Sequence, residues 1–449
     1  MVYLSAFATP MMLSATNVAL PAIANKFALS AVMLSWIPMA YLMASAMFIL
    51  VFGRIADIVG RKQVFIIGTV AIIVSSILTA MSINSAMLLL GRFLQGLSAA
   101  MLYATQMAIV SSVTRPEQRG KAIGLAVSAI YLGLAAGPFL GGVATDYLGW
   151  RANFLLHIPI SLVVLYIGVT KVHGDWMGEK SKVDITGAIL FGFSIILLCV
   201  GLTNVQSLVS LPLLAMCLLC LSVFVRHVLV IQNPIWDIRL LVVNSIFARS
   251  CGASLIMYTA TYANVVLLSL YLQHVKTFSA SLAGLVLMIQ PISMAVLAPV
   301  AGKLSDFTEP RILATAGMIL TAFGLFTLST LTATSQVLLV VFALAMTGIG
   351  FSFFSAPNTN AIMGSVEKKD YGSASGAAAT TRILGQLASM VLVGFVMSWV
   401  LGNQLIDDRN LLALEHAIQL SFGIAAAICI LGVYLSATRG KLHRQIAKG

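Results

Sequence analysis

The chain alternates long apolar runs with short polar links. Each run approaches the roughly 20 apolar residues that a helix needs to cross a bilayer. The runs lie near residues 3–24, 35–53, 64–82, 86–112, 121–144, 152–171, 185–204, 210–231, 247–272, 281–302, 312–331, 336–363, 373–400 and 418–437. The pattern therefore predicts fourteen transmembrane helices. The longest links, 173–184 and 403–417, are too short to form a separate domain.

Composition agrees with this interpretation. Hydrophobic residues make up 60% of the 449 residues and charged residues 9%, whereas a soluble domain carries about 25% charged residues. The sequence therefore predicts an all-α, multi-pass membrane protein. The formal net charge of +12 would suit nucleic acid only if the basic residues gathered on one face with aromatic residues between them. They are scattered, so we expect no nucleic-acid partner.

The sequence shows no pattern for an enzyme, a cofactor or a metal. All five cysteines lie in apolar runs, and the CxxC spacing of Cys217 and Cys220 has no second pair of ligands nearby, so we interpret them as buried thiols. The phosphate-binding pattern GxxxxGK[ST] is missing. We therefore expect an ion or proton gradient, rather than ATP, as the energy source of any transport.

The basic residues predict which way the chain crosses the membrane. Twenty of the 26 Lys and Arg residues lie in the C-terminal tail or in links that follow even-numbered runs, and four lie in links that follow odd-numbered runs. Basic residues collect on the cytoplasmic side of a membrane. The bias therefore predicts a protein of the cell inner (cytoplasmic) membrane with both termini in the cytoplasm.

Part of the sequence is repeated. Gly53 and Asp57 match Gly302 and Asp306 at an offset of 249 residues, and Gly96 matches Gly348 at an offset of 252. Gly120 and Gly124 likewise match Gly372 and Gly376 at an offset of 252. The matches therefore pair runs 2 to 5 with runs 10 to 13, which leaves runs 7 and 8 as an insertion. We therefore predict an N-terminal six-helix bundle over 1–172, a linker with two extra helices over 173–246, and a C-terminal six-helix bundle over 247–449. Parallel repeats of this kind are typical of transporters, with the substrate path between the halves.

Two charges lie inside predicted helices. Arg92 is the single charged residue between Gln63 and Thr114, and Arg382 is the single one between Tyr371 and Ile406. A charge inside a membrane is costly and usually faces a cavity or a partner, although a long side chain near a helix end can also reach the interface. Neighbouring polar residues favour a cavity-facing stripe on the Arg92 helix: Gln95, Tyr103 and Gln106.

Five short motifs give the sequence a family resemblance. They are "TNVALPAIA" (16–24), "GRIADIVGRKQV" (53–64), "GRFLQGLSAA" (91–100), "GLAAGPFLGG" (133–142) and "LGWRANFLLHIPI" (148–160). Together they resemble the major facilitator superfamily, specifically its fourteen-helix drug:proton antiporter branch. The resemblance covers nearly the whole chain. It implies two pseudo-symmetric six-helix bundles plus two inserted helices, and it implies a role for Arg92 in proton transfer.

Physical reasoning gives two of these motifs a role. Small residues let membrane helices approach closely, so we expect a close helix contact at Gly133, Gly137, Pro138, Gly141 and Gly142. The resemblance implies that this contact is an exporter seam; a merely structural helix contact is the alternative. A carboxylate beside arginines at the cytoplasmic helix ends can act as a latch. We therefore expect an inner gate made of Gly53, Arg54, Asp57, Gly60, Arg61 and, in the second half, Asp306. The alternative is that these are ordinary solvated loop charges.

The chain departs from its family where a proton carrier is expected. The branch usually has an aspartate where this chain has Ser14, and no Asp or Glu lies deep in any predicted helix. Proton coupling would then use Asp146 or His157, or would be weak; a lone His is more often simply hydrogen-bonded. A cavity without acids favours neutral or anionic amphipathic substrates, with these polar residues lining the path: Ser14, Asn17, Arg92, Gln95, Tyr103, Gln106, Tyr131, His157, Asn358 and Arg382.

These observations predict a secondary active transporter. We expect it to export small amphipathic molecules by alternating access, coupled to protons, with membrane lipid as its surroundings. A passive facilitator or channel is one alternative, and a transport-inactive membrane sensor is another.

Overall fold

The computed structural model describes the chain except residues 116–117, 173, 175, 178–182, 233, 368–370, 403, 407–408 and 441–449. Within that part the fold is all-helical, and its one β-bridge joins Ser30 to Leu405. Among these described residues, fourteen helices are long and apolar enough to cross a membrane. The predicted fold class and number of spans are therefore confirmed.

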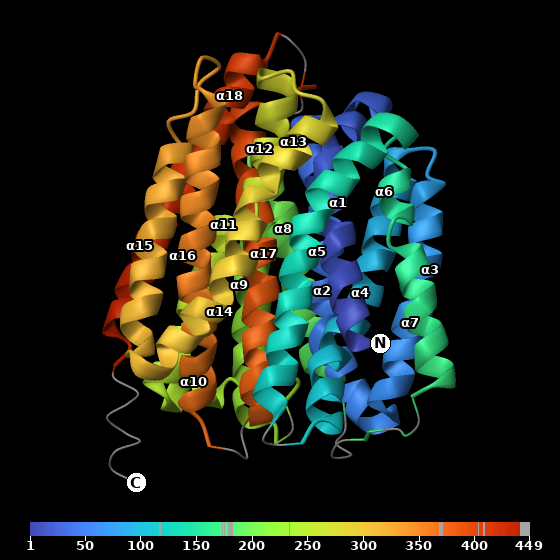
Figure 1. Ribbon diagram of the computed structural model, residues 1–449, viewed down its shortest axis with the longest axis vertical. Coiled ribbons are helices and arrows are strands. Elements are labelled where there is room, and N and C mark those ends of the chain that lie inside the picture. The colour runs from blue at the N-terminus through green and yellow to red at the C-terminus, as the bar shows by residue number, and fades with distance from the viewer. Residues whose placement is uncertain are drawn as a thin grey trace.

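The first six spans form one group, in blue to green in Figure 1. They consist of α1 (Val2–Phe27), α2 (Ala31–Val59), α3 (Arg61–Ala80), α4 (Ser85–Val113), α5 (Arg119–Leu148), and α6 (Ala152–Leu155) with α7 (Ile158–Thr170). The two inserted spans are α8 (Ile185–Thr203) and α9 (Ser210–Val230), followed by the short α10 (Arg239–Val243).

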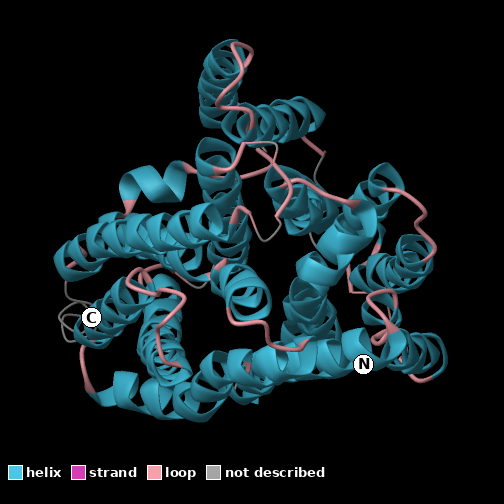
Figure 2. Ribbon diagram, turned by 90° about the horizontal axis from the view of Figure 1, so that it is seen from above, coloured by secondary structure: helices cyan, strands magenta, loops and turns pink. Residues whose placement is uncertain are grey.

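The last six spans form the second group, in yellow to red. They consist of α11 (Ser245–Thr261), α12 (Asn264–Leu270) and the π-turn η2 (Tyr271–Val275); α13 (Ala280–Leu287) and α14 (Ile289–Phe307); α15 (Pro310–Leu328); α16 (Val337–Gly364); α17 (Tyr371–Val400); and α18 (Leu411–Thr438). Seen from above, the helices near the two termini lie on opposite sides of the bundle (Figure 2).

Two details differ from the sequence-based expectation. Helix α18 begins at Leu411, so the second half of the expected link 403–417 is helical. Its Glu415 accepts a hydrogen bond from the Ala333 backbone N–H at 2.8 Å, which accommodates the charge at this end of the helix. The spans 245–275 and 280–305 are also broken within their length, at Tyr262–Ala263 and at Met288.

Glycine contacts repeat between the two halves. A Cβ added to Gly96 of α4 would lie 2.1 Å from the Tyr41 carbonyl oxygen on α2, and one added to Gly348 of α16 would lie 2.5 Å from the Gln290 carbonyl oxygen on α14. The glycines are 252 residues apart and their partners 249 residues apart, which are the two offsets of the sequence repeat. The halves are therefore repeated in packing as well as in sequence.

The inserted helices attach to the bundle through α8. This helix packs against α2 of the first half and α17 of the second, and α9 packs on α8. Where the three helices meet, a Cβ added to Gly394 of α17 would lie 2.8 Å from the Thr203 Cγ2 and 3.0 Å from the Ser35 Oγ. The insertion therefore lies beside the junction of the two halves.

Candidate functional site

Arg92 is fully buried between α2 and α4. Its Nε donates to the Ile37 carbonyl at 3.2 Å and its Nη1 donates to the Gln95 Oε1 at 2.7 Å. The guanidinium also lies over the Tyr41 ring, 4.7 Å from the centroid, in an arrangement that stabilises a cation. No carboxylate of the described residues lies within ion-pair distance of Arg92. A carbonyl, an amide and an aromatic face therefore surround the charge, and the side chain does not reach toward lipid.

A buried hydrogen-bonded chain leads away from Arg92. Gln95 Nε2 donates to Ser76 Oγ at 2.7 Å, and Ser76 Oγ lies 3.3 Å from the Nε2 of His157. All four side chains are buried. The sequence-predicted residues Arg92, Gln95 and His157 are thus brought together, with Ser76 as the link that sequence reasoning missed.

Tyrosines connect Arg92 to the second half. The Tyr41 and Tyr103 hydroxyls are 3.1 Å apart, and the Arg382 guanidinium of α17 lies 5.9 Å from the Tyr103 ring centroid. Tyr103 and Arg382 come from different halves and are both partly exposed. The two intramembrane arginines are therefore placed at either end of a tyrosine pair, Arg92 buried and Arg382 accessible.

The other predicted path residues lie at several places. Tyr131 donates from α5 to Ser355 Oγ of α16 at 3.1 Å, across the halves. Gln106 donates to Ser5 Oγ at 2.9 Å, and Ser14 Oγ donates to the Leu134 carbonyl at 3.3 Å. Ser14 thus lies in the contact of α1 with α5.

Asn358 belongs to a different cluster. Its Oδ1 accepts from the buried Arg439 guanidinium at 2.6 Å, and its Nδ2 donates to the Ser250 carbonyl at 3.1 Å. Burial lowers the pKa of Arg439 to about 10, which leaves it charged at neutral pH. Asn358 therefore joins α16 to the end of α18. Arg439 was missed because the sequence places it only in a basic tail.

The glycine motif of α5 divides into two faces. A Cβ added to Gly133, Gly137 or Gly141 would lie 2.2, 2.7 or 2.6 Å from atoms of α1, which is in the same half. A Cβ added to Gly142 would lie 2.3 Å from the Ala280 carbonyl oxygen of α13, in the other half. The regular stripe therefore packs within one half, and the contact between halves is made by the face that carries Gly142.

The bundle is closed where the last turn of α5 meets the start of α13, which is at the top of Figure 1. We call this the Asp146 end, after the residue of α5 that makes the contact. The Asp146 carboxylate accepts from the Ala280 and Ser281 backbone N–H groups at 3.2 and 2.8 Å, and from the Ser281 hydroxyl. A Cβ on Gly284 of α13 would lie 2.1 Å from the Pro138 carbonyl oxygen. A carboxylate at the first N–H groups of a helix is favourable, so α5 and α13 are joined here by charge and by close packing.

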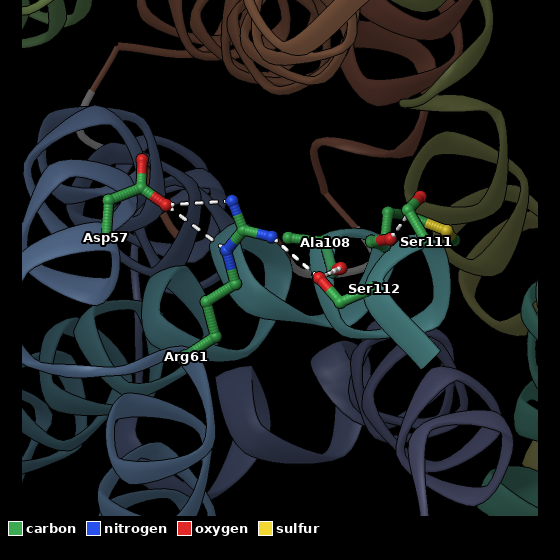
Figure 3. Close-up of polar contacts among 6 residues, drawn as sticks. Asp57, Arg61, Ala108, Ser111 and Ser112 are labelled. Atoms are coloured by element: carbon green, nitrogen blue, oxygen red, sulfur yellow. Dashed lines mark hydrogen bonds and ion pairs between the residues drawn. The ribbon is translucent and has the colours of Figure 1, made fainter. Parts of the chain in front are cut away.

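The opposite end, which holds Asp57, is arranged differently. Arg61 donates from Nε and Nη2 to the Asp57 Oδ1 at 3.1 and 3.0 Å, and from Nη1 to the Ser112 Oγ at 2.9 Å (Figure 3). These contacts join α2, α3 and α4 of one half. Gly60 has a φ of 121°, a conformation that favours glycine, and it allows α3 to begin directly after α2.

The remaining predicted gate residues surround this corner. Arg54 donates to the Pro234 carbonyl at 3.1 Å, which joins α2 to the link before α10. Among the described residues, a Cβ on Gly53 would meet nothing within 4 Å. The side chain of Asp306 lies outside the described residues, so the second copy of the gate stays a prediction.

A second carboxylate cluster holds the inserted helices. Asp184 accepts from the Gly187 and Ile235 backbone N–H groups and pairs with His227 Nε2 at 2.8 Å. Burial alone would raise the pKa of Asp184, but these hydrogen bonds outweigh it and the pKa lies below its ordinary value. The pair fixes α8, α9 and the following link to one another.

Tyr41 is the main residue of the Arg92 site that sequence reasoning missed. It lies under the guanidinium and bonds to Tyr103. The repeat contained a signal for Tyr41, which matches Gln290 at the offset of 249 residues. Both halves therefore have a side chain that can form hydrogen bonds at this position. An aromatic residue in an apolar run carries little information without that pairing.

Comparisons with known proteins identify the family. The profile of the Major Facilitator Superfamily matches residues 2–225 and 250–449. The riboflavin transporter RibZ of Clostridioides difficile (strain 630) is 28% identical over 94% of this chain and 92% of its own. The multidrug resistance protein Stp of Mycobacterium tuberculosis is 28% identical over 85% and 72%. The cephamycin export protein CmcT of Amycolatopsis lactamdurans is 28% identical over 83% and 79%.

A solved structure supports the fold. The crystal structure of a peptide transporter of the POT type matches with a TM-score of 0.69 and 14% identity, over 96% of this chain and 93% of that one. Likeness at this identity speaks for the fold alone. With the family profile and the fourteen spans, it leads to one conclusion: the chain is a multi-pass membrane transporter, not an enzyme, and belongs to the Major Facilitator Superfamily.

Proposed function

We propose that this protein exports small amphipathic compounds by alternating access and that an inward proton gradient drives the export. In this proposal it lies in the cytoplasmic membrane with both termini in the cytoplasm. The Asp146 end then faces outward and the Asp57 end faces the cytoplasm. Export agrees with the names of two relatives, a multidrug resistance protein and a cephamycin export protein.

The observation that carries the proposal is an asymmetry along α5 and α17. At the Asp146 end, Gly142 and Gly394 are in contact with neighbouring helices of other parts of the chain. At the Asp57 end, a Cβ on Gly124 or Gly376 would meet nothing within 4 Å among the described residues. Both pairs are related by the repeat offset of 252. A bundle closed at one end and loose at the other is what one state of an alternating-access cycle requires.

The proton route is proposed from Arg92 to His157 through Gln95 and Ser76. This chain is continuous in hydrogen bonds, and an imidazole can accept a proton on one ring nitrogen and donate one from the other. Arg92 has no carboxylate partner among the described residues. Its positive charge therefore repels a proton that enters this hydrogen-bonded chain and favours the release of that proton. Asp146 is the other candidate, at the outer end.

The substrate is proposed to be neutral or anionic. The exposed part of the route carries the Arg382 guanidinium and the Tyr103 ring, which attract anions and aromatic groups. The described spans place no acid beside them that would hold a lipophilic cation. Riboflavin, in the name of one relative, is an uncharged aromatic compound of this general kind.

Inverted membrane vesicles can test the function. We expect uptake of a fluorescent neutral drug that needs an imposed pH gradient and stops when the gradient is collapsed. A passive facilitator would give flux that is indifferent to the gradient, and an inactive sensor would give none; either result refutes the proposal. Arg92→Ala and His157→Ala should lose gradient dependence, whereas Tyr434→Phe, on an exposed side chain of α18, should behave as the parent.

A further inference from the structure

Arg382 differs from Arg92 in having no hydrogen-bond partner. It lies about three turns into α17, about 17 Å from the start of the helix, which places it well inside a hydrocarbon layer about 30 Å thick. Arg92 uses two of its nitrogens in hydrogen bonds. Within the described part of the chain, Arg382 makes no hydrogen bond and no ion pair. The five N–H donors of a permanent cation are therefore left without an acceptor there.

Tyrosines from both halves lie beside this guanidinium. Its central carbon is 5.9 Å from the centroid of the Tyr103 ring on α4. One turn further along α17, a Cβ added to Gly385 would lie 2.7 Å from the Cβ of Tyr258 on α11. Residues three apart in a helix share a face, so Tyr258 lies on the face of α17 that carries Arg382. The guanidinium is thus accompanied by one ring from each half.

The same set of contacts continues to a third tyrosine. The Tyr258 ring packs edge-on against Phe351 of α16, with 5.3 Å between the ring centroids. Phe351 is one turn before Ser355, whose Oγ accepts from the Tyr131 hydroxyl of α5 at 3.1 Å. Residues from five helices, three of them tyrosines, are therefore joined in one continuous set of contacts beside Arg382.

A space between the halves lies at this place. Among the described residues, α4 and α17 are not a packed pair of helices, so Arg382 and Tyr103 meet through their side chains alone. Both side chains are partly exposed, as are Tyr258 and Ser355. The guanidinium and the rings are therefore accessible to a ligand, whereas the Arg92 guanidinium is fully buried.

We propose that Arg382 binds the carboxylate of a transported aromatic compound, whose ring system packs on Tyr103 and Tyr258. The planar guanidinium can donate two parallel hydrogen bonds to the two oxygens of a carboxylate. Flat rings pack well against tyrosine rings. This proposal rests on the proposed export function and narrows its substrate class from neutral or anionic compounds to aromatic carboxylates.

Other roles for Arg382 fit the contacts less well. A lipophilic cation would be repelled, and a neutral compound would leave the charge uncompensated inside the membrane, which is costly. Arg382 could also serve as a latch between the halves. Its distance of 5.9 Å from the Tyr103 ring centroid is close to the limit of roughly 6 Å for a cation–π contact, and the pair is partly exposed. The contact by itself therefore holds the halves together weakly.

Three related compounds test the proposal directly. Naphthoate carries both the aromatic ring and the charge, naphthamide has nearly the same shape without the charge, and decahydronaphthoate has the charge on a saturated skeleton. Their binding to the purified full-length protein in lipid nanodiscs is measured at neutral pH by isothermal titration calorimetry, with empty nanodiscs as the blank. We expect naphthoate to bind at least about tenfold more tightly than naphthamide and about threefold more tightly than decahydronaphthoate.

Variants assign each preference to a side chain. Arg382→Gln should reduce the ratio of naphthoate to naphthamide affinity to about one. Arg382→Lys keeps the charge but lacks the planar fork, so its ratio should lie between one and that of the parent. Arg249→Gln removes a positive charge from an exposed position of the same half and should keep the full ratio. Tyr103→Leu should abolish the preference for the aromatic acid over the saturated one, whereas Tyr103→Phe should keep it.

The melting temperature separates recognition from a structural role. Because Arg382 has no hydrogen bond or ion pair within the described part of the chain, Arg382→Gln should leave the melting temperature of the free protein unchanged or raise it. Equal binding of naphthoate and naphthamide by the parent would overturn the proposal. A ratio that Arg382→Gln leaves unchanged would also overturn it, and a lower melting temperature with that result would make Arg382 a structural residue. If Arg382→Gln cannot be purified, a ratio in Arg382→Lys equal to that of the parent is the refuting result.

The design also distinguishes this proposal from the proposed function. Binding is measured without a gradient, so it does not depend on transport. If vesicles export a neutral drug but the parent binds naphthoate and naphthamide equally, only the carboxylate site is refuted. If the ratio is at least about tenfold but neither naphthoate nor a neutral drug shows gradient-driven flux, the site stands and the export function is refuted.

Discussion

Replacing Gly142 by alanine should open the Asp146 end of the bundle. The added Cβ would lie 2.3 Å from the Ala280 carbonyl oxygen and 2.8 Å from its carbon. Both atoms are backbone, so no side chain can rotate away. Ordinary contact begins near 3.4 Å, and α5 and α13 must therefore separate by about 1 Å.

The size of the effect follows from that displacement. Adding a methyl group to a tightly packed contact costs about 1–3 kcal/mol. Under the proposed alternating access α5 and α13 separate in the open conformation, so the cost applies only to the conformation in which the Asp146 end is closed. With a tenfold change for each 1.4 kcal/mol, the ratio of open to closed molecules should rise by about 5- to 150-fold.

Neighbouring glycines provide the controls. Gly141→Ala would place its Cβ 2.6 Å from Ala15 Cα of α1; because that contact lies within one half, it should lower the melting temperature and leave the conformational ratio unchanged. Gly124→Ala meets nothing within 4 Å among the described residues and should change neither. Gly142→Ala should therefore differ from both.

Spin labels can measure the ratio. Ile83 and Leu412 are exposed, near the Asp146 end, and lie in different halves. Labels on cysteines at these two positions, in a chain whose five natural cysteines are replaced by alanine, give a distance distribution by double electron–electron resonance. Gly142→Ala should increase the population at long distance. A distribution identical to that of Gly124→Ala would refute the assignment of this contact to the moving interface.

Three other predictions follow. Asp146→Asn keeps the size of the side chain but removes the charge from the start of α13, so the long-distance population should rise by about 2- to 5-fold, as expected for about 0.5–1 kcal/mol; an unchanged distribution would mean that the carboxylate is not a latch. Arg92→Gln should reduce gradient-driven export at least about tenfold while the melting temperature changes little, because the lost charge had no buried ion partner; unchanged export would remove Arg92 from the mechanism. Asp184 has a lowered pKa, so its stabilising effect is present above the ordinary carboxyl pKa of about 3.9 and is lost as pH falls through the lower folded value. Asp184→Asn should therefore lower the free energy of unfolding at pH 7 by about 1 kcal/mol relative to the parent, and this difference should shrink as the pH falls below the ordinary carboxyl pKa; a difference that stays constant with pH would contradict this reasoning.

The sequence predicted the helices well because the signal is local. A helix in lipid must satisfy its own backbone and must be apolar over about 20 residues, and each condition is readable within one run. The exception was the start of α18, where Glu415 and His416 made a helical segment look like a link. Polar residues at a helix end are tolerated when a neighbouring loop, here at Ala333, provides partners.

The candidate site was predicted in part. The sequence alone singled out Arg92 and His157, but their connection through Ser76 depends on three helices meeting. A serine in an apolar run is too common to be noticed. Asn358 was grouped with the central residues because it is a polar residue within a span, and the structure places it with Arg439 instead.

The sequence by itself determined the number of spans, the repeat and the family, because hydropathy, charge bias and glycine spacing are properties of short segments. Only the tertiary structure decided which face of the α5 motif touches α1 and which touches α13, since adjacent glycines such as Gly141 and Gly142 look alike along the chain but point about 100° apart around a helix. It also decided that a ring, a carbonyl and an amide surround Arg92, because such partners come from distant segments and from backbone atoms that every residue possesses.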